Sequence, residues 1–252
     1  MRIAIITGAS SGLGEEFALQ MGSYFSDIDE VWLIARRREK LEALTEKLHG
    51  IETTVLPLDL CDASSFTVFA EKLAAEKPDV RLLINNAGIG FLGNVGEGDV
   101  SRQVNMTELN MTALTAVTHL ALPYMSKGSR IINVSSIASF CANARMTVYS
   151  STKAYVSSFT RGLALELKSR GIFVTAVCPG PMATEFLGIG GIAGNSRTFE
   201  TLPYCNPKKV VAGTLKASKA GRVFYTPTFF FKLYRVLAKI LPHALVCHMA
   251  KC

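Results

Sequence analysis

The chain has 252 residues, 49% of them hydrophobic and 19% charged, so it can bury a substantial core and is not a disordered protein. Its formal net charge is +7, but the basic residues are spread along the chain apart from Arg36, Arg37 and Arg38, and no nucleic-acid motif accompanies them. The charge therefore favours a phosphorylated small molecule or an anionic surface as the partner, and argues against a nucleic acid.

The N-terminal sequence passes from Met1 almost directly into an apolar run and a glycine loop, without the segments of a secretory signal. The six cysteines are scattered and form no CxxC pair. We therefore expect a cytoplasmic protein with reduced cysteines.

Short apolar, β-branched runs recur along the chain and predict buried parallel strands. They lie at residues 2–7, 30–35, 53–59, 80–88, 130–136 and 172–180. Segments with helical periodicity alternate with them, at residues 15–23, 39–48, 64–76, 101–125 and 149–170. This alternation predicts an α/β fold, namely a Rossmann-like doubly wound parallel sheet with helices on both faces, in a single domain.

A glycine loop follows the first predicted strand and precedes a helix. Free N–H groups and the helix dipole favour a pyrophosphate at such a place, and glycines let the backbone approach the ligand. The spacing G-x-x-x-G-x-G differs from the familiar G-x-G-x-x-G, and a tight turn without a ligand is the alternative. The residues predicted to bind here are Gly8, Ser10, Ser11, Gly12, Leu13 and Gly14.

The second predicted strand ends in Ala35, followed by three arginines. A site that prefers NAD usually has an acidic residue here, whereas guanidinium groups suit the 2′-phosphate of NADP(H). We therefore predict NADP(H) over NAD, with Arg36 and Arg37 as ligands. Arg38, and to a lesser extent Arg37, could instead be solvated residues at the start of the next helix.

Tyr149 and Lys153 are four residues apart at the start of a predicted helix. Their side chains then lie on one helical face, close enough for the cation to act on the phenol's proton. Such pairs are also common on solvated helices, so the pair indicates chemistry only in company with other motifs.

From its first strand to about residue 184, the chain resembles the short-chain dehydrogenase/reductase family. Each matching element is weak alone, but their order is specific, with Ser136 thirteen residues before Tyr149. The elements are Thr7-Gly8-x-x-x-Gly12-x-Gly14, Asp59, Asn85-Asn86-Ala87-Gly88, Asn110, Ser136, Tyr149-x-x-x-Lys153, Pro179-Gly180 and Thr184.

The resemblance implies a role for each of four catalytic residues. Tyr149 would protonate the developing alkoxide, and Lys153 would lower the phenol's pKa from about 10. Ser136 would hydrogen-bond the substrate oxygen, with Ser135 as its rival. Asn110 would hold a water that links Lys153 to solvent.

The resemblance also implies the remaining cofactor contacts, and no metal. Asp59 would contact the adenine edge, its neighbour Leu60 is also expected to bind the cofactor, and the nicotinamide end would include Thr184. Tyr149 and Lys153 are also expected to contact the cofactor. The other expected cofactor residues are Asn86, Ala87, Gly88, Pro179 and Gly180.

We expect one domain over residues 1–252, with a cofactor-binding and catalytic core (1–184), a substrate loop (185–205) and an amphipathic C-terminal tail (226–252). In the tail, cationic residues recur at spacings of three to four and leave an apolar face. The cationic residues are Lys232, Arg235, Lys239 and His243, and the apolar ones are Leu233, Val236, Leu237, Ile240 and Leu241.

Three alternatives are open for this tail. It could be a helix packed over the substrate pocket, an oligomer interface or an interfacial membrane anchor. The first two are favoured because an apolar stripe usually faces protein. The tail lacks the strand and Gly-Gly turn that help many bacterial members form tetramers, so a homo-oligomer is expected but the tetramer is in doubt.

The resemblance implies an NADP(H)-dependent oxidoreductase that interconverts a ketone and a secondary alcohol. The apolar loop suggests a bulky apolar substrate, such as a steroid or bile-acid derivative. One alternative is a 3-ketoacyl reductase of lipid metabolism; another is a non-catalytic NADP(H)-sensing protein, which would not need a proton relay. The loop residues behind this expectation are Met182, Phe186, Leu187, Ile189, Ile192 and Phe199.

Overall fold

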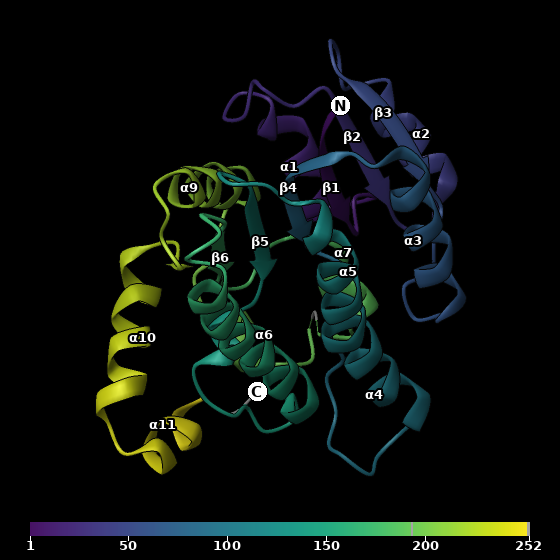
Figure 1. Ribbon diagram of the computed structural model, residues 1–252. Coiled ribbons are helices and arrows are strands. Elements are labelled where there is room, and N and C mark those ends of the chain that lie inside the picture. Colours follow the sequence, from purple (N-terminus) through teal and green to yellow (C-terminus); the bar gives the residue numbers. More distant parts are fainter. Residues whose placement is uncertain (193, 251–252) are drawn as a thin grey trace.

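A computed structural model describes residues 1–192 and 194–250. In this part of the chain, seven parallel strands form one sheet in the order β3-β2-β1-β4-β5-β6-β7 (Figure 1). The strands are β1 Arg2–Thr7, β2 Glu30–Ile34, β3 Glu52–Leu56, β4 Asp79–Asn85, β5 Arg130–Val134, β6 Phe173–Val177 and β7 Phe224–Tyr225. The doubly wound parallel sheet predicted from the sequence is confirmed. The unpredicted strand β7 has only two residues, too few for a periodic signal.

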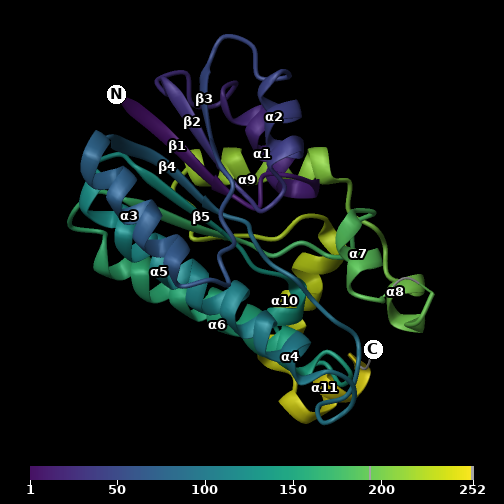
Figure 2. The same ribbon diagram turned by 90° about the vertical axis from the view of Figure 1, so that its right-hand side faces the viewer.

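Helices cover both faces of the sheet, as Figure 2 shows. Alternate residues of β1 therefore enter different cores: Ile6 packs in the cluster that contains Phe17, and Ile5 in the cluster that contains Trp32. The first cluster includes side chains of α1 Gly12–Met21, α2 Arg38–Thr45 and α9 Pro207–Lys219, and the second includes those of α3 Ser64–Glu76, α5 Ala113–Ala121 and α6 Thr147–Glu166.

Helix α9 was not among the predicted helices, although its start has a clear local cause. The Asn206 side chain accepts a hydrogen bond from the Lys209 backbone N–H, and Pro207 occupies the first helical turn. Asparagine is a favoured N-cap, and proline loses no helical hydrogen bond at this position.

The helix predicted over residues 101–125 is interrupted. Helix α4 (Val100–Thr107) passes into a π-helical turn, η1 (Glu108–Thr112), before α5, and the segment ends in a 3₁₀ turn, η2 (Leu122–Tyr124). Single π-helical turns inside α-helices occur frequently at functional sites. Asn110 lies within this turn and is buried.

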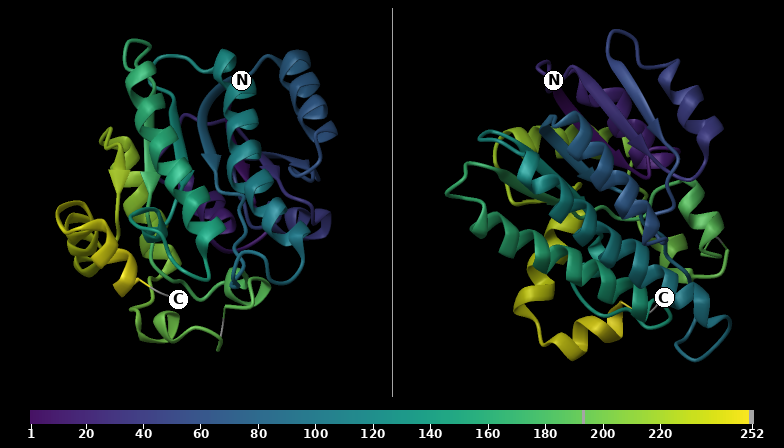
Figure 3. Two further views of the ribbon diagram at one scale, coloured as in Figure 1. Left: turned by 90° about the horizontal axis from the view of Figure 1, so that it is seen from below. Right: turned by 45° about the vertical axis from the view of Figure 1, so that its right-hand side comes forward.

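The predicted substrate loop contains two short helices, α7 Glu185–Ile189 and α8 Arg197–Thr201, and a 3₁₀ turn, η3 (Ile137–Ser139), follows β5. The tail forms two helices, α10 Phe229–Ile240 and α11 His243–Met249, at the edge of the molecule next to β7 (Figures 1 and 3). The helical face predicted to run through His243 is therefore wrong at its end. Pro242 has no N–H to continue α10, so Leu241 lies outside that helix and His243 begins the next one.

Candidate active site

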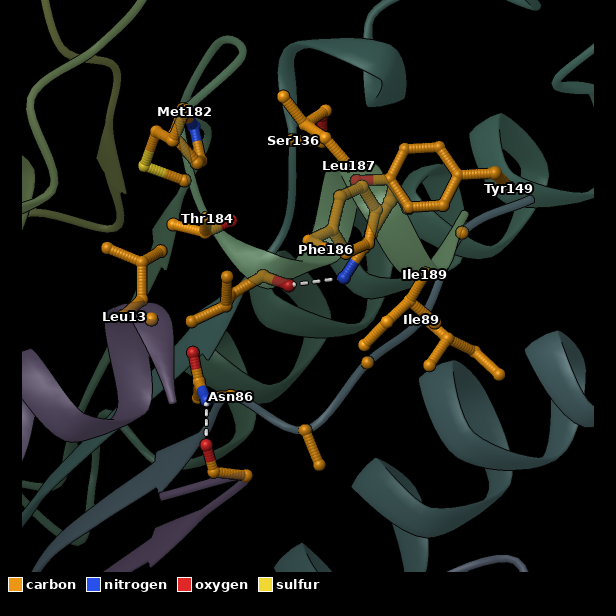
Figure 4. A pocket seen from close by; sticks show the side chains of 18 of the residues that line it. Leu13, Asn86, Ile89, Ser136, Tyr149, Met182, Thr184, Phe186, Leu187 and Ile189 are labelled. Carbon is orange, nitrogen blue, oxygen red and sulfur yellow. Dashed lines mark hydrogen bonds between the residues drawn. The ribbon is translucent and has the colours of Figure 1, made fainter. Parts of the chain in front are cut away.

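A cavity of about 550 Å³ opens at the carboxyl ends of the strands. The chain turns to opposite sides of the sheet from the neighbouring strands β1 and β4, which is where doubly wound sheets leave a ligand crevice. Of the predicted site residues, all but Gly14 and Asn110 line this cavity. Leu13 and Asn86 lie at one end in Figure 4, and Ser136 and Tyr149 at the other.

The glycine loop has a shape that side chains would not permit. Gly8 adopts a positive φ of 66°, and a Cβ there would lie 2.8 Å from Ala87 Cα. A Cβ on Gly14 would lie 2.1 Å from the Gly8 carbonyl oxygen, so only a glycine permits the loop to pack this closely on α1. Gly14 does not line the cavity. The Asn86 amide donates hydrogen bonds to the carbonyls of Thr7 and Gly8, at 3.0 and 3.1 Å, and braces the loop.

We predict that Gly14→Ala destabilises the protein by about 1–3 kcal/mol, because the new methyl group displaces the Gly8 carbonyl. Gly162→Ala is the matched control: Gly162 also lies in a helix, and a Cβ there meets nothing within 4 Å. The control should gain about 0.5–1 kcal/mol from reduced backbone entropy. Urea unfolding measures both, and equal effects of the two substitutions would contradict the loop geometry.

The three arginines after β2 have different surroundings. Arg37 lies against the glycine loop, with its Nη2 atom 3.1 Å from Ser10 Oγ. Arg36 lies 3.9 Å from a carboxylate oxygen of Asp59, and both residues line the cavity. Arg38 points instead to Glu42 one helical turn away, at 3.5 Å, as expected for a solvated helix start.

A carboxylate from the predicted substrate loop joins this cationic group. Glu185 accepts from Arg37 Nη1 at 2.8 Å and from Lys40 Nζ at 2.6 Å. These two hydrogen bonds lower the pKa of Glu185 to about 2, Lys40 having the larger effect. Two cations thus converge on one anion beside the glycine loop, as a phosphate site requires.

Tyr149 and Lys153 lie on α6 and are both buried. The ammonium nitrogen of Lys153 is 5.8 Å from the centroid of the tyrosine ring and donates a hydrogen bond to the Val134 carbonyl at 2.8 Å. The ring of Phe186 lies 5.6 Å from the tyrosine ring, centroid to centroid (Figure 4). The phenol therefore has an apolar neighbour from the loop and a cation one turn away.

Ser135 and Ser136 are separated by the alternation of the strand that precedes them. Ser135 is directed into the protein, where its hydroxyl donates to the Lys153 carbonyl at 2.9 Å and also contacts Ser157. Ser136 Oγ accepts from the Ala138 N–H at 3.1 Å and forms a hydrogen bond with the phenol of Tyr149. Ser136 is thus the serine beside the tyrosine.

Asn110 contacts the site from behind. Its side-chain oxygen accepts from the Ile89 N–H at 2.9 Å, and its amide nitrogen donates to the Ile89 carbonyl and to Thr152 Oγ1. These bonds tie the loop after β4 to α6. A Cβ on Gly88 would lie 3.0 Å from Asn110 Oδ1 and 3.4 Å from Lys153 Nζ, so both polar groups approach this glycine.

Burial shifts the two central pKa values in opposite directions. It raises the pKa of Tyr149 to about 12, against the smaller lowering effect of the hydrogen bond with Ser136. It lowers the pKa of Lys153 from 10.5 to about 8. The phenol therefore keeps its proton at neutral pH, and the lysine is close to its titration point.

Sequence reasoning missed Lys40, which lies beside the cavity, and several residues of the cavity lining. Lys40 had no signal, because its partner Glu185 is distant in sequence. Helix α10 lines the cavity with Phe230, Phe231 and Tyr234, none of which belongs to the apolar face predicted for the tail. Phe231 is so close to the turn after β6 that a Cβ on Gly180 would lie 2.2 Å from its ring.

Comparison with known proteins identifies a family. Residues 2–188 match the model for the short chain dehydrogenases. The very-long-chain 3-oxoacyl-CoA reductase of Anas platyrhynchos is 31% identical over 209 residues, which cover 79% of this chain. The match spans only 65% of that reductase.

Solved structures share the fold over nearly the whole chain. A short-chain dehydrogenase from Sphingobium yanoikuyae in complex with NADPH has a TM-score of 0.80 at 26% identity, with 97% of this chain and 98% of that chain covered. The bulky-bulky ketone specific alcohol dehydrogenase from Comamonas testosteroni has a TM-score of 0.74 at 25% identity, with 97% and 96% covered.

Proposed function

Since the chain belongs to the short-chain dehydrogenase family, we propose that it is an NADP(H)-dependent oxidoreductase that reduces the ketone group of a bulky apolar substrate. The observation that carries this proposal is the buried group formed by Tyr149, Ser136 and Lys153 at one end of a cavity whose other end is a glycine loop.

The proposed proton chemistry follows from the pKa shifts. A phenol with a pKa near 12 is a proton donor at neutral pH, so the ligand-free site is prepared for carbonyl reduction. As negative charge develops on the carbonyl oxygen, Ser136 donates a hydrogen bond to it and Tyr149 transfers its proton. Lys153 stabilises the resulting phenolate. The proposed cofactor supplies the hydride.

The site also fits the proposed cofactor at its phosphates. The glycine loop and the N-terminus of α1 suit the pyrophosphate, and Arg37 and Lys40 suit a 2′-phosphate, because they already bind a carboxylate. Asp59 and Arg36 would lie at the adenosine end, and Thr184 at the nicotinamide end. For Asn110, the relay through a water remains a prediction, and its hydrogen bonds indicate a role in holding Ile89 and Thr152.

The proposed substrate class follows from the cavity lining. The loop residues in the lining are mostly apolar, namely Met182, Phe186, Leu187, Ile189 and Phe199, and α10 adds aromatic rings. Ile192, expected from the sequence to join them, does not line the cavity but is fully buried in the core cluster that also contains Tyr149 and Leu187. A bulky hydrophobic ketone, such as a steroid or bile-acid derivative, fits this lining. The specificity for bulky ketones of the Comamonas relative supports this class.

The test is to titrate the purified protein with NADPH and with NADH, and then to follow NADPH absorbance with a panel of ketones. We expect tighter binding of NADPH and turnover of a steroid or bile-acid ketone. Turnover of a 3-ketoacyl-CoA alone would favour the alternative that the duck relative suggests, a 3-ketoacyl reductase. Cofactor binding without any turnover would favour a sensor.

We predict that Arg37→Gln weakens NADPH binding by roughly tenfold and leaves NADH binding nearly unchanged, because the lost hydrogen bonds go to a charged group. Glu185→Gln should tighten NADPH binding by about threefold, because its carboxylate competes with the 2′-phosphate for exposed cations. Arg38→Gln is the control, since its partner is Glu42. Equal effects of Arg37→Gln on both cofactors would contradict the assignment.

A further inference from the structure

Helix α10 contacts the rest of the protein through one side only. Phe231 is fully buried, and the hydroxyl of Tyr234 lies 2.8 Å from the Cys141 sulfur. The guanidinium of Arg235 stacks 4.5 Å from the centre of the Phe224 ring, and Ala238 is buried in a small cluster with Cys141 and Val246. This side anchors the helix at the edge of the sheet and forms part of the cavity wall.

The opposite side of α10 is apolar and exposed. We call it the outer face, made of Phe229, Leu233, Val236, Leu237 and Ile240, which recur with helical spacing. Phe229 is 80% exposed, Ile240 74% and Val236 50%. Leu245 of α11 adds a further exposed apolar residue. In Figures 1 and 3 the helix lies at the periphery, with no other element outside it.

The positive charge of the chain is concentrated in its C-terminal part, where five of the nine cations lie on α9 or just after it and the other four in the tail. Residues 1–200 carry eighteen Lys and Arg against twenty Asp and Glu, a net charge of −2. Residues 201–252 carry nine Lys and Arg and no carboxylate side chain, a net charge of +9. The whole positive excess of the protein therefore lies in its last 52 residues. Lys232 and Lys239 are exposed along one edge of the outer face.

From this combination we propose that the outer face of α10 docks on a membrane surface that contains anionic lipids. Apolar side chains enter the boundary between headgroups and acyl chains, while the lysines beside them bind anionic headgroups. Among the residues that the structure describes, no helix is long and apolar enough to cross a bilayer. The proposed contact is therefore peripheral, with the helix lying in the plane of the membrane.

A second copy of the chain fits the outer face less well. In a two-fold contact the same surface of each copy meets, so Lys232 and Lys239 of both copies would be brought into one interface. No acidic side chain in residues 201–252 could neutralise them. An anionic lipid surface satisfies both the apolar side chains and the charge, and this inference does not depend on the catalytic assignment.

The test is co-sedimentation of the full chain with vesicles of phosphatidylcholine alone or with an equal share of phosphatidylglycerol. We expect binding to the anionic vesicles that weakens as salt is added. The double variant Leu233→Glu/Ile240→Glu should lose at least tenfold in affinity. Lys232→Gln and Lys239→Gln, which leave the apolar packing intact, should each lose about fivefold on anionic vesicles.

The matched control is Val68→Glu, because Val68 is 47% exposed on α3, which lies on the other side of the molecule from α10 in Figure 1. It should bind vesicles like the wild type, and each variant's NADPH affinity and melting temperature report whether it is folded. Absence of wild-type binding to anionic vesicles would overturn the proposal. So would an equal loss in Val68→Glu, or a wild-type oligomer in light scattering that the double variant dissociates without any change in vesicle binding.

Discussion

Tyr149→Phe is expected to lower the rate of ketone reduction by roughly three orders of magnitude or more and to leave NADPH binding nearly unchanged. The substitution removes only the phenolic oxygen, which is the proposed proton donor. The ring stays buried against Phe186, and loss of the hydroxyl leaves no buried polar group unpaired, since Ser136 Oγ also contacts the Ala138 N–H. Steady-state kinetics and an NADPH titration separate the two effects.

Tyr155→Phe provides the control on the same helix. Tyr155 is partly exposed, and its hydroxyl shares a hydrogen bond with Thr115 Oγ1 at 2.7 Å, away from the cavity. Its removal should change the rate by less than about threefold, since surface substitutions cost little. Retained activity in Tyr149→Phe would remove Tyr149 from its proposed role, whatever the control shows.

Lys153→Met is expected to abolish turnover, because no cation would then stand beside the phenolate, yet to cost the folded state little. Lowering the pKa of Lys153 from 10.5 to about 8 means that burial of its charge costs the folded protein roughly 3 kcal/mol below pH 8. Methionine removes this cost, although the Val134 carbonyl loses a donor worth about 1–3 kcal/mol.

The pH dependence of stability has a definite sign. Between about pH 8 and 10.5 the folded protein has released the proton of Lys153 while the unfolded chain still holds it. The unfolded state then holds one more proton at Lys153, so the contribution of this residue to wild-type stability rises with pH in this window. The difference in stability between Lys153→Met and wild type should shift in favour of the wild type over the same range.

Urea unfolding at pH 7 and at pH 10 measures this shift. Lys168→Met is the control, because Lys168 is exposed just after the same helix. A difference between Lys153→Met and wild type that does not change with pH would show that the folded state does not lower the pKa of Lys153.

Much of the site was predictable from sequence because most motifs can be placed relative to the end of a predicted strand. The glycine loop, Asp59, Asn86, Ser136 and Gly180 lie at or just after the ends of predicted strands, and the carboxyl ends of parallel strands meet at one edge of a sheet. The spacing favoured Ser136 over Ser135, and the structure gives the physical reason: Ser135 is directed toward Ser157 and helix α6. Local patterns of this kind are predictable from sequence because they depend on the backbone geometry near each residue.

The parts that sequence could not give depend on the path of the chain between distant elements. Glu185 meets Arg37 and Lys40 only because α7 crosses toward the loop after β2. In the tail, periodicity identified the apolar face of α10 but not whether this face is directed toward the protein or toward the exterior. The cavity is lined from the other side, by Phe231 and Tyr234. Four of the five predicted apolar residues face outward, and Leu241 packs against a small core cluster.

Helix α10 thus separates the cavity from the exterior by the thickness of a single helix. A lipid-soluble ketone gains about 0.8 kcal/mol for each methylene group that it buries in a bilayer, so it is greatly enriched there over water. For an enzyme held at such a surface, the relevant substrate concentration is the one in the lipid phase. The apparent KM, expressed per volume of suspension, would then depend on how much lipid the assay contains.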